Sequence, residues 1–531
     1  MGIQKKYLPL IVSVAIATGV FVGSKLNFQD SNEKIFATNS KKDKLNRLID
    51  YIDYEYVDKV NTDSIVDVTV NGILENLDPH SVYIPVDDYE RNADDMRGNF
   101  VGIGISFYPY RDSIAVIRAI EGGPAEKAGV KGGDRILYAD GRKLFGPDVH
   151  RDSISAFLKG EINSKVNLKV YRPSEDKMID IRLKRKNVPL VSVDASYKLT
   201  KDIGYIKVNR FSETTYREFR DALDDLTDSG IKSLVLDLRN NPGGYIYAAE
   251  KLVDEFLEKD KLIVITRNKS GEESKSYATS KGSFENGHIY VLINENSASA
   301  SEIVAGALQD NDKGTIIGRR SFGKGLVQRE MALGDGSAVR LTIARYYTPT
   351  GRSIQKPYGN GNGEYYSDYE KRYKNGELED PENIRVADSL RYVTPKGKVV
   401  YGGGGIIPDV FVPKDTSVEN ETLEYVSRSS FMSFFIFEYL ENNRSFFNGM
   451  TFKQFAENYE IPESLKEEFI AYSRFEEAQI DLSSYKDQLG VALKANIAQQ
   501  LFGPNAFEFF INDGDPMLKK VVEIETGSGS E

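Results

Sequence analysis

Cysteine is absent from the 531-residue sequence, and histidine is scarce. Without cysteine, the chain has no thiol nucleophile, thiolate zinc site, iron–sulfur cluster or disulfide scaffold. Its histidines are His80, His150 and His288, so a histidine metal cluster or a Ser–His triad would have to use these three. The formal net charge of −11 disfavours nucleic acid as a partner, because phosphate binding needs a basic face.

The remaining composition is that of an ordinary globular protein. Hydrophobic residues make up 40% and charged residues 28% of the sequence, so disorder is not the default expectation. At about 100–200 residues per domain, a chain of this length predicts several domains.

The N-terminus has the pattern of an export signal. Lys5 and Lys6 precede an apolar run over residues 7–23, which is close to the shortest run that crosses a bilayer. No A-x-A cleavage site is evident, so we favour an uncleaved anchor, although a cleaved signal peptide stays open. We therefore predict a signal peptide or anchor over 1–28 and a linker over 29–41. Because positive charge stays inside, the rest should be extracytoplasmic, in the periplasm.

Residues 42–94 are predicted to be helical. Apolar residues recur there at spacings of three and four, as in Leu45, Leu48 and Ile49. The phrase LDPHSVYIP at 77–85 contains the turn signal Asp78-Pro79.

Residues 95–188 have short strands separated by glycine turns. The phrase GGPAEKAGVKGGDRILYADGRKL at 122–144 resembles a PDZ domain. The resemblance implies a groove that binds a peptide's C-terminal end as an added strand. Backbone N–H groups of Gly102, Ile103, Gly104 and Ile105 would bind its carboxylate. The alternative is that these glycines serve only as turn residues.

Residues 189–531 divide into segments with different sequence patterns. Strands and helices alternate over 189–355, which predicts an α/β core with mostly parallel strands. The polar segment 356–400 is predicted to be an insertion, followed by the end of the core over 401–418. A helical period over 419–515 predicts a helical C-terminal domain, and residues 516–531 are expected to form a tail.

Ser299 is predicted to lie at a strand-to-helix turn. It follows the apolar run Ile289–Ile293 and precedes the helix-forming run IVAGALQD. The N-terminus of that helix offers free N–H groups and a positive dipole end, which favour an oxyanion. Serine is also a preferred helix cap, so a purely structural role stays open at this step.

Lys324 lies between two glycines after another predicted strand, with Gln328 four residues on. A lysine in a dry pocket loses its charged form and can accept a proton. The spacing of four places both side chains on one face in either a strand or a helix, so Gln328 would orient the amine. A solvated loop lysine is the alternative. A phosphate-binding loop is disfavoured, because Gly325 stands where that motif needs Ser or Thr.

A third segment, Leu238 to Gly244 (LRNNPGG), follows a buried strand and precedes a helix. Ligand sites in α/β sheets lie beyond the carboxyl ends of such strands. Gly243 and Gly244 would let the backbone approach a substrate carbonyl closely, and a tight turn would need the same glycines.

Together these phrases resemble the carboxy-terminal processing peptidases, or tail-specific proteases, which are S41-type serine peptidases with a PDZ domain. The shared phrases are LDPHSVYIP, DLRNNPGG, NENSASASEIVAGALQD, GRRSFGKGLVQ and YYTPTGRSIQ…GGGGIIPDV, with the PDZ block. The resemblance implies a crotonase-like α/β protease core. It also implies a Ser–Lys pair that needs no metal or cofactor.

Carried over by position, the resemblance implies Ser299 as nucleophile, Lys324 as general base and Gln328 as the residue that orients it. Backbone N–H groups of Ala300 and of Gly243 or Gly244 would form the oxyanion hole. Asp310 matches an acidic position with a supporting role.

The sequence departs from the family pattern in three places. Lys159-Gly160 stands where many members have Arg-Gly, which puts coupling of the PDZ domain to the core in doubt. The insertion at 356–400 and the helical domain after 419 lie outside the common core. The predicted function is an exported serine endopeptidase that binds protein substrates by their tails, with an oligomer possible. The alternative is an inactive PDZ scaffold or a tail-binding chaperone at the membrane.

Overall fold

The computed structural model describes residue 13 and residues 40–110, 113–146, 151–359, 361–475, 481–486 and 488–527. The chain divides into two compact units, Met1–Asn76 and Leu77–Glu531. The predicted membrane segment 7–23 lies outside the described residues, apart from Ser13. Within the described ranges, no helix is both long enough and apolar enough to span a bilayer.

In the first unit, the described residues 40–76 form the helices α2 (Ser40–Glu55) and α3 (Thr62–Glu75). Asn61 caps α3, because its side chain accepts a hydrogen bond from the Ser64 nitrogen at 3.2 Å. The predicted helical segment 42–94 thus includes α2 and α3, and in the second unit it continues with β1 (Val82–Ile84) and α4 (Val86–Arg97).

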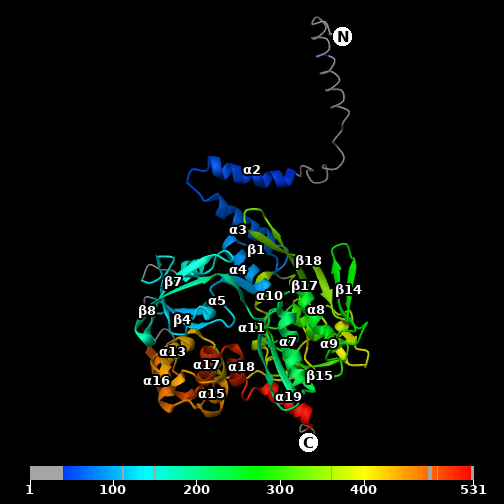
Figure 1. Ribbon diagram of the computed structural model, residues 1–531. Coiled ribbons are helices and arrows are strands. Elements are labelled where there is room, and N and C mark those ends of the chain that lie inside the picture. Colours follow the sequence, from blue (N-terminus) through cyan, green and yellow to red (C-terminus); the bar gives the residue numbers. More distant parts are fainter. Residues whose placement is uncertain are drawn as a thin grey trace, which may run out of the picture. The chain divides into compact units, whose positions relative to one another are not determined.

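A six-stranded sheet forms the centre of the second unit (Figure 1). Its order is β10-β11-β12-β15-β16-β21, and all neighbours are parallel except β10 and β11. Strands β11 and β12 are buried along their whole length, as expected for parallel strands covered on both faces. The bounds are β10 Val193–Lys198, β11 Ile203–Val208, β12 Ser233–Asp237, β15 His288–Ile293, β16 Gly314–Gly318 and β21 Val410–Phe411.

Helices cover both faces of this sheet. Along β12, Leu234 and Leu236 face the cluster made by α7 (Thr215–Asp228), α8 (Ile246–Asp254) and α9 (Ala300–Asp310), whereas Val235 faces the opposite side.

The opposite face is covered by α19 (Pro516–Thr526), through its buried residues Met517, Leu518 and Val521. The expected tail over 516–531 is thus wrong for its first eleven residues. Their apolar side chains complete the sheet's core, which their position at the end of the sequence did not indicate.

A second, antiparallel sheet lies next to the first and contains Gln328, whereas Lys324 lies just before its strand β17. Its order is β1-β18-β13-β14, with β17 on the other side of β18. The added bounds are β13 Leu262–Asn268, β14 Glu273–Tyr277, β17 Leu326–Ala332 and β18 Ala338–Tyr347. Since β1 and β17 both pair with β18, the LDPHS phrase lies near the strand that contains Gln328.

The PDZ region has its own sheet and core. The sheet order is β3-β4-β5-β7-β8, with β6 on β5, while β2 pairs separately with β9. The bounds are β2 Asn99–Gly102, β3 Ile105–Tyr110, β4 Ser113–Ala119, α5 Pro124–Lys127, β5 Arg135–Ala139, β6 Arg142–Lys143, α6 Arg151–Leu158, β7 Lys165–Arg172, β8 Lys177–Lys184 and β9 Lys186–Pro189. The edge strand β3 leaves one side open for an added strand.

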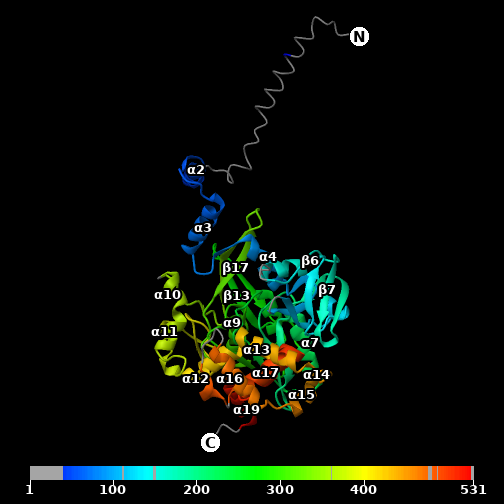
Figure 2. The ribbon, with the colours of Figure 1, turned by 90° about the vertical axis from the view of Figure 1, so that its left-hand side faces the viewer.

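The predicted insertion is folded against the core (Figure 2). It contains α10 (Asn362–Tyr366), α11 (Asp368–Lys374) and the hairpin β19–β20 (Arg391–Val393 and Val399–Tyr401). The helical C-terminal domain contains α12 Val418–Ser427, α13 Ser430–Asn442, α14 Arg444–Phe447, α15 Phe452–Asn458, α16 Glu463–Phe475, α17 Leu489–Phe502 and α18 Pro504–Ile511. The predicted fold class, a multidomain α/β protein with a PDZ domain and helical segments at both ends, is confirmed.

The C-terminal domain packs against the outer face of the PDZ sheet, where α13 lies against β3 and β4 (Figure 1). Phe437 of α13 is 1% exposed, and its ring centroid lies 5.3 Å from that of Tyr110. The guanidinium of Arg135 lies over both rings and pairs with Glu441. The same domain contacts the core sheet, since Lys207 pairs with Glu508 at 3.0 Å. The PDZ sheet is therefore tied to the core through a third domain.

We expect Phe437→Ala to lower the free energy of unfolding by about 3 kcal/mol, because it leaves a cavity between two domains. Urea unfolding monitored by circular dichroism would measure the change. Tyr425→Ala on α12 is the control, since Tyr425 is 69% exposed and should change stability by less than about 0.5 kcal/mol. Equal effects of the two substitutions would show that the α13 contact does not stabilise the protein.

Candidate active site

Ser299 lies between β15 and α9, at the strand-to-helix turn that the sequence predicts. Its backbone has φ 55° and ψ −113°, a region that residues with a side chain rarely occupy. Such a conformation costs about 1–3 kcal/mol and persists only where surrounding contacts impose it. Ser299 is half-buried.

Lys324 lies in an irregular segment between β16 and β17, and its side chain is half-buried. Its Nζ donates to Oε1 of Gln328 at 2.8 Å. Gln328 in turn donates through Nε2 to the backbone oxygen of His80. The prediction that Lys324 and Gln328 face each other is confirmed. In the described part of the chain, no hydrogen bond joins the amine to the Ser299 hydroxyl.

Burial lowers the pKa of Lys324 from its ordinary value of 10.5 to about 8. The positive charge of Arg340 acts in the same direction, while Glu302 and Asp78 oppose it. Burial and the charge of Lys324 also lower the pKa of His80 to about 3, so that imidazole is neutral at neutral pH. The amine can therefore lose its proton near physiological pH, as a general base requires.

Glu302 joins the Ser299 turn to the Lys324 segment, and it is completely buried. One carboxylate oxygen accepts from the backbone nitrogens of Ser299 at 2.9 Å and Lys324 at 2.8 Å. The other accepts from Ser321 Oγ at 2.5 Å and the Gly323 nitrogen at 2.7 Å. Burial raises the pKa of Glu302, and these hydrogen bonds oppose the rise.

A second link between the two segments is the hydroxyl of Tyr346. It lies 3.0 Å from the backbone oxygen of Ser299 and 2.6 Å from that of Lys324. The Ser299 and Lys324 segments are thus linked through both their N–H and their C=O groups.

Of the two predicted glycines, Gly243 lies beside Ser299, and Gly244 lies against Phe211. A Cβ atom on Gly243 would lie 2.7 Å from Ser299 Cβ and 2.9 Å from the Ala300 nitrogen, so only glycine fits there. The Gly243 nitrogen already donates to Oδ1 of Asn241 at 2.9 Å. Among the described residues, none accepts from the nitrogens of Gly244 or Ala300. These two N–H groups are therefore the better candidates for an oxyanion hole.

Asp310 does not lie with Ser299 and Lys324. It is at the far end of α9, where it pairs with Arg352 at 2.7 Å and accepts from Thr350 Oγ1 at 2.6 Å. Both ion-pair side chains are fully buried. Its support of the site is therefore indirect, through the C-terminal end of α9.

The predicted carboxylate-binding loop lies between β2 and β3. Ile103 is 1% exposed, and Gly104 has φ 77°. Their carbonyl groups accept from Ala125 and Ile120. The N–H groups of Ile103 and Gly104 have no acceptor within the described ranges. Gly102 pairs with Lys186, and Ile105 begins the edge strand β3.

Lys159, where the family pattern has arginine, still connects the PDZ region to the core. Its Nζ donates to Oδ2 of Asp94 at 2.8 Å, and the Asp94 side chain is 8% exposed. Asp94 belongs to α4, which is joined to the core because the Glu213 nitrogen donates to the Met96 oxygen. A lysine thus makes the contact that its substitution for arginine had put in doubt.

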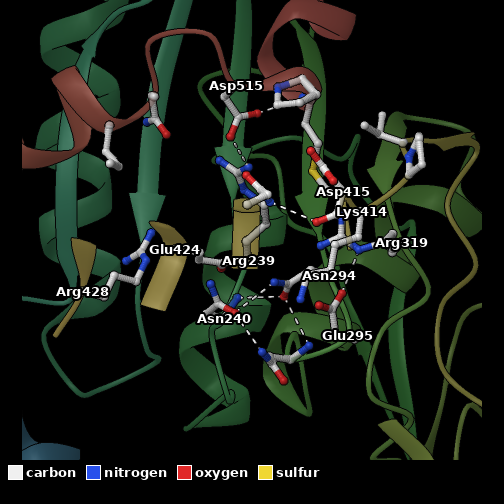
Figure 3. Close-up of a pocket in the computed structure, with 18 of the residues that line it drawn as sticks. Arg239, Asn240, Asn294, Glu295, Arg319, Lys414, Asp415, Glu424, Arg428 and Asp515 are labelled. Carbon is white, nitrogen blue, oxygen red and sulfur yellow. Dashed lines mark hydrogen bonds and ion pairs between the residues drawn. The ribbon is translucent and has the colours of Figure 1, made fainter. Parts of the chain in front are cut away.

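A polar cavity of about 570 Å³ lies beyond the carboxyl ends of the core strands, against the C-terminal domain (Figure 3). Ser299 and Lys324 do not line it. Arg239 projects into it and pairs with Asp237 at 2.6 Å and with Asp515 at 2.5 Å. Arg239 lies in the loop after β12, four residues before Gly243. Its ion pair with Asp515 links this loop to the start of α19.

Sequence reasoning missed Glu302, Tyr346 and the orienting contact of His80. Glu302 had a signal, since it lies three residues after a helix-capping serine, as in a capping box. That pattern predicts a helix start but not the contacts to Ser321, Gly323 and Lys324. Tyr346 and His80 reach the site through long-range packing, which leaves no local pattern.

Three family models match the chain. Peptidase family S41 matches residues 202–360, a PDZ domain matches 101–183, and a family of unknown function, DUF8443, matches 422–503. The S41 match contains Ser299 and Lys324, and the DUF8443 match lies in the C-terminal helical domain.

Curated relatives are similar over most of their length. The carboxy-terminal-processing protease of Bartonella bacilliformis is 36% identical over 64% of this chain and 80% of that protein. The carboxy-terminal processing protease CtpA of Bacillus subtilis is 32% identical over 73% of this chain and 84% of that protein. CtpB of the same organism is 34% identical over 59% of this chain and 65% of that protein, just under two thirds of its length.

We expect Glu302→Gln to lower the free energy of unfolding by about 3 kcal/mol, because an amide accepts through one atom only and leaves buried N–H groups unpaired. Urea titration would measure the loss, with Glu419→Gln on the exposed part of α12 as the control. A stability equal to that of the control would contradict the structural role assigned to this carboxylate.

Proposed function

The chain belongs to the carboxy-terminal processing proteases of peptidase family S41, and from that premise we propose that it cleaves exported proteins whose C-terminal tails its PDZ domain binds. Ser299 is the nucleophile, Lys324 the general base and Gln328 the residue that orients the base. The observation that carries this assignment is the half-buried Lys324 amine, held by Gln328 and tied through Glu302 to the Ser299 turn.

The reaction is an acyl transfer in two steps. Neutral Lys324 takes the proton of the Ser299 hydroxyl as its oxygen attacks the peptide carbonyl, and the N–H groups of Gly244 and Ala300 stabilise the oxyanion. The protonated lysine then gives its proton to the leaving amine, and an acyl-enzyme remains. Water attacks that ester with Lys324 again as base, which releases the new C-terminus and restores Ser299.

The PDZ groove would hold the tail of the substrate. Edge strand β3 offers its open side to an added strand, and the N–H groups of Ile103 and Gly104 would bind the terminal carboxylate. Lys5, Lys6 and the apolar run 7–23 support a location outside the cytoplasm with a membrane anchor.

We expect wild-type protein to cut an unfolded protein that has an apolar C-terminal tail, and Ser299→Ala and Lys324→Ala to abolish cleavage. Mass spectrometry of the fragments would follow the reaction. Lys269→Ala, in the exposed turn between β13 and β14, should cleave as wild type does. Amidation of the tail should slow cleavage, because it removes the carboxylate. Turnover that survives Ser299→Ala would refute the assignment, and tail binding without any cleavage would indicate a tail-binding protein.

We expect kcat/KM to rise about tenfold per pH unit below a pKa near 8 and to level off above it. The sign follows from the base, because the protonated amine has no lone pair to accept the serine proton. Initial rates from pH 6 to 10 would measure the profile. A limb near the ordinary histidine pKa of about 6.5 would point to a different base.

A further inference from the structure

Residues 356–378 form the first part of the predicted insertion 356–400, and they include buried charged residues. Arg372 of α11 is 2% exposed and Glu377 is 4% exposed. A buried arginine needs partners for its charge and its donors, because desolvation is otherwise costly. The partners of Arg372 therefore show which part of the core this segment contacts.

Arg372 donates to the chain that leads into Lys324. Its Nη1 lies 3.0 Å from the oxygen of Arg320 and 2.9 Å from that of Ser321, and its Nη2 lies 3.4 Å from the oxygen of Phe322. Asp368, one turn earlier on α11, pairs with the guanidinium at 2.8 Å. Three successive carbonyl groups before the lysine are thus held by one side chain.

The segment 320–325 has no regular secondary structure, so its backbone groups need other partners. Glu302 accepts from the N–H groups of Gly323 and Lys324 on one side. Arg372 donates to the C=O groups on the other. A buried anion and a buried cation together fix the backbone that positions the Lys324 amine.

Helix α10 supports the same site through His80. Tyr365 Oη lies 2.7 Å from His80 Nε2, and Tyr366 donates to the oxygen of Pro79. The oxygen of His80 accepts from Gln328. Lys356 adds a further contact, because its Nζ lies 3.9 Å from the ring centroid of Phe322 and 4.3 Å from that of Tyr365.

We propose that residues 356–378 brace the general-base segment, with Arg372 as a positioning residue for Lys324 and Tyr365 as a positioning residue for Gln328. The proposal rests on the proposed peptidase function but goes beyond it, since it gives the insertion a role in the reaction. Neither side chain touches the Ser299 hydroxyl in the described contacts. Arg372 acts through the backbone that leads into Lys324. Tyr365 acts through His80, whose backbone oxygen accepts from the Gln328 side chain.

The first test compares Arg372→Ala, Arg372→Lys and wild type in the cleavage assay. We expect Arg372→Ala to lower kcat at pH 7 by about 10- to 100-fold with KM little changed, because the base is displaced while the substrate contacts remain. A single amine cannot reach three carbonyl groups, so the kcat of Arg372→Lys should lie between those of Arg372→Ala and wild type. Lys374→Ala on the same helix is the control, since its side chain is 70% exposed.

The pH profile separates positioning from a purely structural role. A loosened segment lets water reach the amine, which favours its charged form. The pKa near 8 that is read from the pH–rate profile should therefore be higher in Arg372→Ala. Tyr365→Phe, which removes only the hydroxyl, should move it in the same direction by less. A variant that is less stable to heat but keeps the wild-type kcat and limb would overturn the proposal. If Arg372→Ala does not fold, the pKa read from the pH–rate profile of Arg372→Lys is compared with that of wild type instead.

A second readout does not depend on cleavage. Brief acetylation with acetic anhydride over a range of pH, followed by mass spectrometry of the peptide that contains Lys324, gives the titration of its amine. We expect a higher midpoint in Arg372→Ala than in wild type. If wild type cleaves nothing, the proposed function fails, while a shifted midpoint still supports the brace. An unshifted midpoint in the folded variant refutes the brace whether or not the protein is a peptidase.

Discussion

The buried carboxylate of Glu302 is the contact on which the arrangement of the site depends. It accepts hydrogen bonds from one end of the Ser299 turn and from three positions of the segment that contains Lys324. Neither segment could hold its conformation alone, because Ser299 has a positive φ and residues 320–325 lack regular structure. The Ser299 turn and the Lys324 segment are therefore held together by one buried side chain.

Glu302 accepts only from donors, so the carbonyl groups of the same two segments need hydrogen-bond donors from other elements. Tyr346 and Arg372 donate to carbonyl groups of the same two segments, so both sides of the backbone are satisfied. Asp515, the N-cap of α19, pairs with Arg239, which lies four residues before Gly243. The insertion contributes contacts to the Lys324 segment, although it lies outside the phrases that resemble the family. The polar character of segment 356–400 reflects these buried contacts as well as exposure to solvent.

The architecture leaves local patterns in the sequence and could be predicted from them, whereas the roles proposed for Ser299 and Lys324 rest on the resemblance to the family. Buried parallel strands appear as apolar runs, and the spacing of Lys324 and Gln328 predicts that their side chains share one face. Arg372 and Glu302 could not be predicted in the same way, since a buried charge looks like a solvated one until its partners are known. Helix α19 was taken for a tail for a related reason: its apolar residues Met517, Leu518 and Val521 show their role only against the sheet that they cover.

The orientation of Gln328 also determines how the lysine can act. Its amide nitrogen donates to the oxygen of His80, so its oxygen must face Lys324. A neutral amine that gives one proton to this oxygen keeps its lone pair for the serine hydroxyl, whereas a protonated amine has none. The His80 ring, with a pKa of about 3, keeps one protonation state throughout the range in which Lys324 titrates. Gln328 donates to the backbone oxygen of His80, which does not titrate, so this hydrogen bond does not depend on the protonation of Lys324.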